Sequence, residues 1–154
     1  AITVGSSYQL NDDFKISTAY TGAFSRGDTT SGKLLSLDSP RLVSTAFTVG
    51  LESKNLLSDT DRLHFSVSQP LRVNGGSMSL MYDEYYDEDE ILHTRRVDID
   101  LASTGRQIDY QLQYIFAPKQ KAVTVGLFAY YADDYLHQAN TTDYGAGLRI
   151  QGNF

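Results

Sequence analysis

Seven charged side chains recur at one parity of a sequence that alternates between polar and apolar residues. Lys15, for example, lies between Phe14 and Ile16. Successive side chains of an extended strand point to opposite faces, so these charges would line one face together. Charged groups on a partly enclosed face pair with one another, or they contact a hydrated segment that lies against them. The seven residues are Lys15, Glu52, Arg62, Asp98, Asp100, Asp109 and Arg149.

The residue types that could catalyse a reaction or bind a metal form no recognisable motif. His64, His93 and His137 are far apart in sequence, and no pair of them has the spacing of a metal site with a third ligand. His137 follows Asp133 and Asp134, the one grouping that could support acid–base chemistry, but no convincing nucleophile accompanies it. We therefore expect no enzymatic activity, no metal and no cofactor.

The densest run of charge is the acidic stretch DEYYDEDE at residues 83–90. It lacks the glycine and the ligand spacing of a calcium-binding EF-hand loop. We interpret it as a solvated loop, although its carboxylates could attract divalent cations.

A period of two runs through almost the whole chain and predicts the elements that position these residues. No helical period competes with it for long. The turn Asn74-Gly75-Gly76 is a strong hairpin signal, and other short polar turns separate the remaining segments. The pattern predicts an antiparallel up-and-down meander of about nine strands. The predicted strands cover about residues 2–10, 14–24, 43–52, 62–73, 77–84, 95–102, 106–116, 122–132 and 143–154.

The composition limits the classes of function. The 154 residues suffice for one domain, which we assign to 1–154. The absence of cysteine excludes disulfides and cysteine metal sites, and a formal net charge of −6 argues against nucleic acid as the main partner. No apolar run approaches the roughly 18 residues of a transmembrane helix, but this does not exclude strands that cross a membrane.

The alternation leaves open which solvent the apolar face meets. It points inward in a soluble barrel and outward to lipid in a membrane barrel, whose polar face lines the lumen. Three features favour lipid: the mid-strand apolar positions carry no charge, the strands approach the 9–11 residues that spanning requires, and aromatic residues lie near strand ends as in interfacial girdles. We predict an all-β, antiparallel, up-and-down transmembrane β-barrel. The aromatic residues are Tyr8, Phe14, Phe24, Tyr82, Phe116, Tyr131, Tyr144 and Phe154.

The last predicted strand resembles that of a known family. In DYGAGLRIQGNF, an apolar face holds Tyr144, Leu148 and Ile150 and ends on Phe154. This pattern resembles the C-terminal assembly signal of bacterial outer-membrane barrels and the last strand of autotransporter translocator domains. With SVSQPLRVNGG, RRVDIDLASTGRQIDYQLQY and VGLFAYYADD, the resemblance covers residues 63–154 and is nearest to the barrels of subtilisin-like serine-protease autotransporters. Gly152 departs from it, since that position usually carries a second aromatic residue.

The resemblance implies a function and a set of partners. The chain would be the translocator and anchor of a type V secretion system in a bacterial outer membrane, and would support surface delivery of a covalently linked upstream passenger. Its partners would be outer-membrane lipid and lipopolysaccharide, the barrel-assembly machinery and that passenger, which the charged lumen wall would contact. The protease motifs of such passengers are absent from this sequence.

The strand count leaves alternatives. The family's barrel has twelve strands, so either about three more lie upstream or eight of those predicted here close on themselves. Counting back from a periplasmic C-terminus places loops 26–41 and 133–142 outside the cell, but acidic residues 83–94 on the periplasmic side. Two other functions stay open: a small closed outer-membrane barrel with a structural or interaction role, and a soluble β-barrel that binds an apolar ligand.

Overall fold

Ten strands and one short 3-10 helix make up the described part of the chain in a computed structural model, namely residues 1–26, 34–37, 41–118 and 123–152. The paired strands are antiparallel, which confirms the predicted all-β class. In these ranges no helix has the length and apolar character needed to span a bilayer. The elements are β1 (Ile2–Gln9), β2 (Phe14–Ser25), β3 (Leu35–Leu37), β4 (Leu42–Lys54), β5 (Asp61–Gly75), β6 (Ser77–Tyr86), β7 (Leu92–Asp100), β8 (Ile108–Phe116), β9 (Val123–Asp133), η1 (Tyr135–His137) and β10 (Thr142–Gly152).

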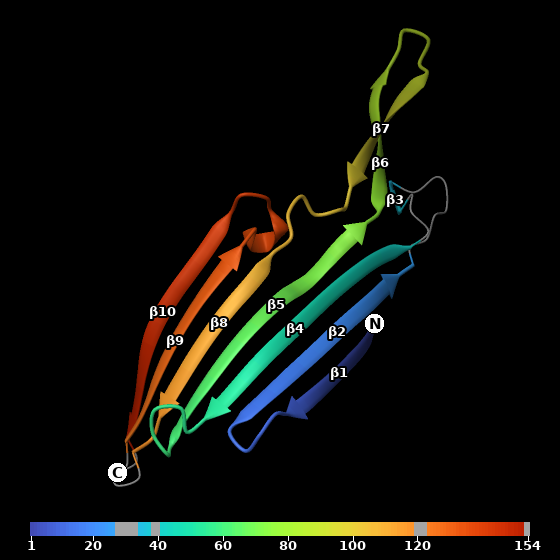
Figure 1. The fold of residues 1–154 in the computed structure, drawn as a ribbon. Coiled ribbons are helices and arrows are strands. Elements are labelled where there is room, and N and C mark those ends of the chain that lie inside the picture. Colours follow the sequence, from blue (N-terminus) through green and yellow to red (C-terminus); the bar gives the residue numbers. More distant parts are fainter. Residues whose placement is uncertain (27–33, 38–40, 119–122, 153–154) are drawn as a thin grey trace.

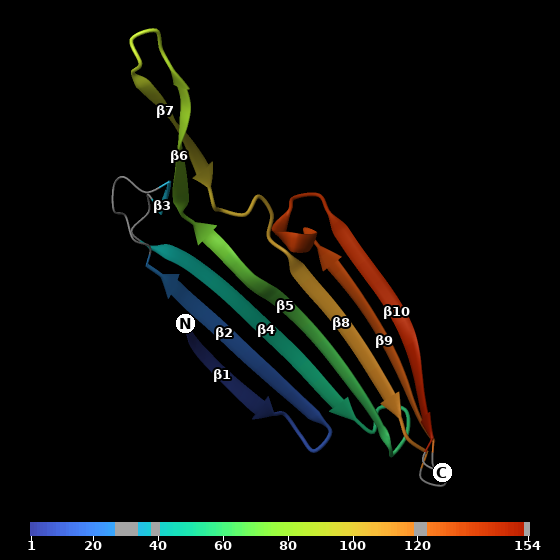
Figure 2. The same cartoon turned by 180° about the vertical axis from the view of Figure 1, so that it is seen from behind.

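Seven of the strands form one sheet in the order β1-β2-β4-β5-β8-β9-β10 (Figure 1). Each strand pairs with the next strand of this sheet along the chain, so the predicted up-and-down meander holds here. The view from behind shows the same succession of long, obliquely running strands (Figure 2). Among the described residues the sheet is open, with β1 and β10 as its edges.

The prediction that all nine strands belong to one meander is wrong. β6 and β7 leave the large sheet and pair with each other and with β3 in a separate three-stranded sheet, which projects from one end (Figures 1 and 2). The turn Asn74-Gly75-Gly76 therefore closes no β5–β6 hairpin, because β5 pairs with β4 and β8 instead. Alternation at 78–82 and 97–101 is the same in a projecting hairpin as in a spanning strand, so the sequence pattern does not separate the two cases.

Gly76 is the point at which the chain turns away. Its φ of 149° lies outside the usual range of other residues, and an added Cβ would overlap with the side chain of Leu42. The chain returns beside it, since the amide of Leu101 donates a hydrogen bond of 2.9 Å to the Gly76 carbonyl. The projecting hairpin therefore leaves and rejoins the large sheet at almost the same place.

The acidic stretch lies at the tip of this hairpin, at the end of the sheet that also holds the β9–β10 loop (Figure 1). The predicted position of residues 83–94 at the same end as the C-terminus is wrong. That position came from counting β6 and β7 as strands of the large sheet, which they do not cross. The loop predicted at 133–142 is confirmed, with β9 ending at Asp133 and β10 beginning at Thr142.

A bulge changes the faces of β5 near its end. Phe47 pairs with Gln69 and Thr45 pairs with Arg72, so two residue steps along β4 lie opposite three residue steps along β5. Arg72 therefore lies on the face that alternation would give to its neighbours. Pro70 lies between these paired positions, and a proline inside a strand, which has no N–H for the ladder, commonly marks a bulge. The alternation by itself did not show this shift.

Candidate functional site

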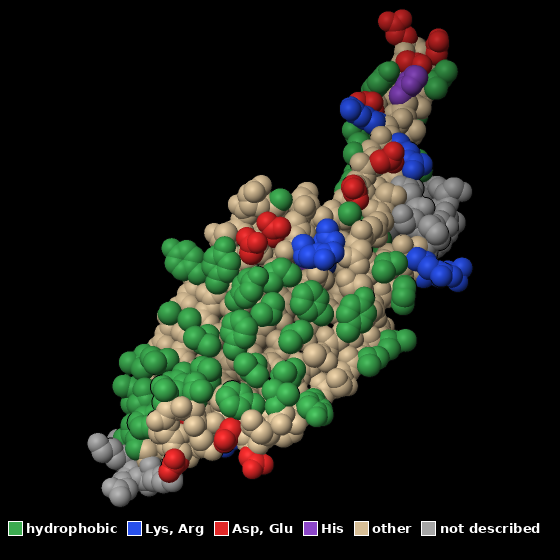
Figure 3. Space-filling model, in the orientation of Figure 1, with side chains coloured by type: hydrophobic (Ala, Val, Ile, Leu, Met, Phe, Trp, Pro, Cys, Tyr) green, Lys and Arg blue, Asp and Glu red, His purple; other side chains and the backbone are tan. Residues whose placement is uncertain are grey.

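The apolar positions of the seven strands of the large sheet share one face, except at the end of β5, where the bulge places Arg72 on this face and Val73 on the other. Register pairs connect them in continuous rows, and alternation then sends each row's side chains to the same side. The hydrophobic side chains gather over this sheet in Figure 3. One row across the whole width consists of Tyr8, Ile16, Leu51, Phe65, Leu112, Ala129 and Ala146.

This face is uncovered in the described structure. Leu112, Leu127 and Leu148 are 44%, 50% and 59% exposed, in the middle of their strands. Burial is inverted relative to a water-soluble protein: Ala132 is the one buried hydrophobic residue in the described ranges, whereas the other buried residues are polar or glycine. Soluble monomers rarely expose apolar patches beyond a few hundred Å², so a face of this width needs an apolar partner.

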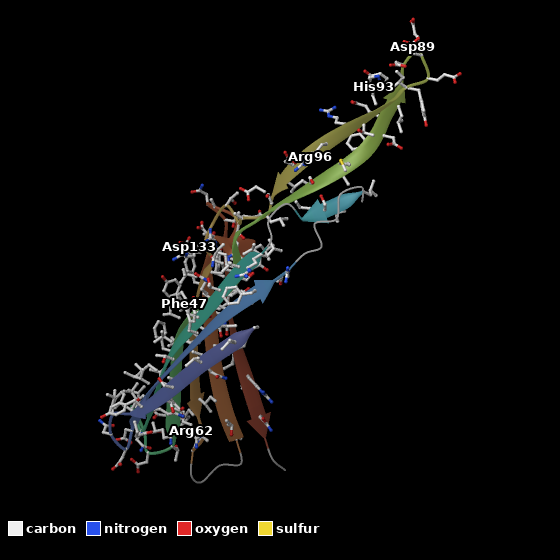
Figure 4. All side chains as sticks on the ribbon, turned by 90° about the vertical axis from the view of Figure 1, so that its right-hand side faces the viewer. Phe47, Arg62, Asp89, His93, Arg96 and Asp133 are labelled. Carbon is white, nitrogen blue, oxygen red and sulfur yellow. The ribbon has the colours of Figure 1, made fainter. Side chains whose placement is uncertain are left out.

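Tyrosines mark one border of the apolar face. Tyr110, Tyr131 and Tyr144 follow one another across β8, β9 and β10, with the rings of the first two 6.2 Å apart. Beyond them, towards the β9–β10 loop, Asp133 already begins the polar end, where Figure 4 labels it. Phe116 lies towards the opposite end, beside Asp61 in the register. Such borders suit rings that are apolar on one side and wet on the other.

Five of the seven predicted charged residues lie on the opposite, polar face of the large sheet. Lys15 and Glu52 are register partners, while Arg62, Asp109 and Arg149 lie on β5, β8 and β10. Lys15, Glu52 and Asp109 are partly exposed, and the two arginines are exposed. The structure thus brings these five onto one wall, as the alternation predicted.

Asp98 and Asp100 do not join that wall. They lie on β7 and pair in register with Ser79 and Ser77 of β6, in the projecting sheet. Asp98 accepts a hydrogen bond of 2.7 Å from Nε of Arg96, and Asp100 accepts the amide of Ala102 at 2.8 Å. Their separation from the other five has the same cause as the wrong strand count, because β7 is not part of the large sheet.

The five charges on the wall form no ion pair among the described residues. Asp109 accepts Nε2 of Gln107 at 2.7 Å, and Arg149 donates to Gln151 at 3.2 Å. The predicted network of mutually paired charges is therefore not seen on this face. The end of the wall near the C-terminus carries most of the positive charge, since Lys54 and Arg62 pair in register beside Lys15 and Glu52.

Aromatic rings lying over glycines join β9 to β10 on the polar face. Gly145 pairs with Tyr130 and Gly147 with Phe128, and an added Cβ at either glycine would overlap with its partner's ring. The Tyr130 hydroxyl also donates to Asp143 at 3.1 Å. A ring can cover a glycine backbone on the next strand and thereby stabilise the pair. The sequence analysis missed these joints because recognising them requires the register.

Asp61 is a second residue that the sequence analysis missed. It is 1% exposed and accepts the amides of Leu56 and Leu57, each at 2.7 Å, and that of Ser58 at 3.0 Å. The hydroxyl of Tyr114 adds a fourth hydrogen bond at 2.8 Å. One carboxylate thus fixes the β4–β5 turn and links it to β8. The signal available was the turn sequence SDTD, in which an aspartate commonly binds nearby backbone amides.

The histidines have separate environments. His64 lies on the polar wall, in register with Glu52. His93 Nε2 lies 2.8 Å from Asp87 in the projecting hairpin, and its ring stacks on Tyr85. Both ring nitrogens of His137 contact backbone groups, so no carboxylate orients it as in a catalytic pair. Across the described ranges no cluster of three or more His, Asp or Glu side chains could hold a metal ion.

Three of the four predicted assembly-signal residues lie on the edge strand β10. Tyr144, Leu148 and Ile150 project from its apolar face and are 77%, 59% and 66% exposed. Phe154 lies outside the described residues.

Comparisons with known proteins add no family to this description. No protein-family model, curated protein or solved structure matches the chain.

Proposed function

We propose that this chain forms a transmembrane β-barrel of a bacterial outer membrane, or the C-terminal part of one, with its apolar face towards lipid. One observation carries the proposal: seven paired strands present one wide, uncovered apolar face, while Ala132 is the one hydrophobic residue that they bury among the described residues. Lipid supplies the apolar partner that such a face needs, and the polar face then lines a lumen.

The strand lengths support this orientation. The spanning strands β8, β9 and β10 have 9, 11 and 11 residues, close to the roughly 9–11 residues that a tilted strand needs to cross a bilayer. The tyrosine border would lie at the interface on the side of the β9–β10 loop. Asp133 and the projecting acidic hairpin would then lie in water on that side, which we assign to the cell exterior.

The proposed barrel requires that the open edges of the sheet find strand partners. Unpaired backbone groups cost several kcal/mol each in hydrocarbon, so β1 and β10 cannot both remain unpaired in a bilayer. They would pair with each other after a change in curvature, or with further strands encoded upstream. The resemblance to twelve-stranded translocators favours upstream strands.

Within this class we propose the role of an autotransporter translocator. The barrel would anchor the chain, be inserted by the barrel-assembly machinery and support surface delivery of an upstream passenger. The C-terminal strand with Tyr144, Leu148 and Ile150 on its lipid side supports the assembly step. The polar wall, whose five charges form no ion pair among the described residues, supports a hydrated lumen along which a passenger segment could pass. The proposal gives this chain no enzymatic role.

The first test is an electrophoretic mobility measurement. The 154-residue chain, refolded in detergent, is run on SDS gels with and without boiling. A faster band without boiling would mean that this chain closes by itself. If no shift is seen, the gel is repeated with the upstream residues restored. A shift that appears only then supports the larger barrel, whereas no shift in either form contradicts the membrane barrel.

Two further observations separate the alternative functions. A signal peptide encoded directly before Ala1 would leave no passenger and would favour the small closed barrel. Folding to a monomer without detergent or lipid would favour the soluble barrel. For the translocator, protease added to intact cells should release an upstream passenger, and replacing the Tyr144–Phe154 segment should abolish that release.

A further inference from the structure

The strand β5 extends beyond the strand that pairs with it. Its last register pair with β8 is Ser68 with Asp109, whereas β5 itself continues to Gly75. This leaves an edge of β5 without a strand partner on the β8 side. The β9–β10 loop, residues 134–141, and the connection between β7 and β8 fill this place (Figure 1).

His137 is the residue of the loop that reaches β5. Its Nε2 lies 3.2 Å from the carbonyl oxygen of Leu71, and its Nδ1 lies 3.1 Å from the amide nitrogen of Gln107. A carbonyl can only accept and an amide N–H can only donate. The ring must therefore carry its proton on Nε2 and use Nδ1 as an acceptor, which only the neutral imidazole can do.

Further hydrogen bonds join the β7–β8 connection to the β9–β10 loop. The amide of Gly105 donates to the His137 carbonyl at 2.8 Å, and Oε1 of Gln107 accepts the amide of Leu136 at 2.8 Å. Gln107 is itself buried at 9% exposure. The contacts of His137 thus complete a small network rather than an isolated bond.

The loop backbone is strained in this conformation. Asp134, Leu136, His137 and Asn140 all have φ between 49° and 63°, the left-handed region that residues other than glycine rarely adopt. Four such residues in one loop need contacts to hold them. Losing a central contact would therefore favour other conformations of the loop.

Charged groups of both signs surround His137 and its contacts. On β5, Arg72 donates to the carbonyls of Gly105 and Ser103 at 2.9 and 3.0 Å, which places a fixed positive charge beside the network. In the loop, Asp134 already accepts the amides of Arg106 and Asn140. Asp109 of β8 accepts Nε2 of Gln107, the Arg106 side chain is exposed, and Asp133 ends β9. Within the part of the chain that the structure describes, no carboxylate contacts the ring directly to compensate a second proton.

We propose that His137 is a pH-sensitive latch that holds the β9–β10 loop against β5 and the β7–β8 connection while the ring is neutral. A proton on Nδ1 would set an N–H against the N–H of Gln107 and remove that hydrogen bond. Histidine is the side chain whose charge commonly changes between about pH 5 and pH 8. Because the closed loop uses Nδ1 as an acceptor, acidification favours opening and uncovers the edge of β5. The latch does not depend on the proposed function.

Amide hydrogen exchange tests the latch in the full chain, refolded in detergent micelles and observed by NMR. The protection factor of the Gln107 amide, taken relative to the intrinsic exchange rate at each pH, should be at least about tenfold lower at pH 5 than at pH 7.5. The ring ¹⁵N shifts should show Nε2–H at pH 7.5 and a second proton at pH 5. The amide of Leu148, far from the loop on β10, should keep its protection.

Variants separate the latch from a general acid effect. His137→Gln cannot gain the proton, so its Gln107 protection should no longer depend on pH, whereas His93→Gln should respond as the unaltered chain does. Equal Gln107 protection at both pH values, an Nδ1–H tautomer at pH 7.5, or a response that persists in His137→Gln would overturn the proposal. If His137→Gln does not fold, the ring shifts and the exchange of the unaltered chain still decide the question.

Discussion

At the scale of single residues, neighbouring positions on one strand have opposite environments. Leu112 projects from the apolar face of β8 beside Phe65 and Ala129, and Gln111 projects from the polar face beside Ser66 and Tyr130. Both side chains are exposed in the structure, so exposure alone does not distinguish them. The solvent on each side does, if the apolar face meets lipid.

A charge placed on each face measures this difference. Leu112→Arg should lower the free energy of unfolding by roughly 2–4 kcal/mol, the cost of an arginine near the bilayer midplane, whereas Gln111→Arg should cost much less. Urea titrations of refolded protein in lipid vesicles would give both values. Equal tolerance at the two positions would contradict the assignment of faces.

Asp87 holds the turn at the tip of the projecting hairpin through hydrogen bonds to its carboxylate. The hydrogen bond from His93, then that from the amide of Ile91, holds the pKa of Asp87 below its ordinary value of 3.8. The unfolded turn binds the proton more tightly, so the stabilisation by this carboxylate is present above pH 3.8 and is lost as the pH falls through the lowered pKa. Exchange protection of the Ile91 amide should therefore decline below about pH 4.

The matched variant is Asp87→Asn. It should reduce Ile91 protection near neutral pH and remove its decline in acid, since no carboxylate is left to protonate. A decline in acid that persists in Asp87→Asn would assign the effect to another group of this acidic tip.

At the scale of elements, β9 and β10 depend on shape as well as on backbone pairing. Gly147→Val should destabilise the chain by about 1–3 kcal/mol, because the new side chain occupies the place of the Phe128 ring. The loss should be smaller in a Phe128→Ala background, from which that ring has been removed. A double-mutant cycle measured by urea unfolding gives the coupling, which we expect to be at least about 0.5 kcal/mol.

Gly126 provides the control for this cycle. It lies on the same face of β9, and a Cβ there would meet Arg149 atoms only at 3.8 Å or more, an ordinary contact. Gly126→Val should therefore show no coupling to Phe128→Ala. Coupling of the same size at both glycines would refute a specific joint between ring and glycine.

At the scale of the whole molecule, the chain consists of a sheet and an appended hairpin. β5 pairs with β8 directly, and the hydrogen bond between Gly76 and Leu101 brings the two ends of the hairpin together. Replacing residues 77–100 by a short Gly-Ser linker should therefore leave the large sheet intact. Circular dichroism and the boiled-versus-unboiled gel, compared with the full chain, should show the same fold and mobility behaviour. Loss of folding would mean that the hairpin is part of the core structure.

The sequence by itself determined the properties that depend on neighbouring residues. Alternation is local, since every second side chain of a strand lies on one face, and so it predicted the strands, the apolar face with Leu112 and Leu148, and the polar wall with Lys15, Glu52, Arg62, Asp109 and Arg149. The same pattern placed Tyr131 and Tyr144 at the border, but it also included Tyr82, which lies on β6 in the projecting sheet, and it did not include Tyr110.

Only the tertiary structure decided which strands pair. Asp98 and Asp100 alternate like the residues of a spanning strand, yet β7 pairs outside the large sheet, because the choice of partner is made between segments distant in sequence. The rings over Gly145 and Gly147, the cap formed by Asp61 and the reach of His137 to β5 depend in the same way on register and on loop geometry. Local alternation sets the face of a side chain, whereas its neighbours across the sheet are set by contacts that the local pattern does not contain.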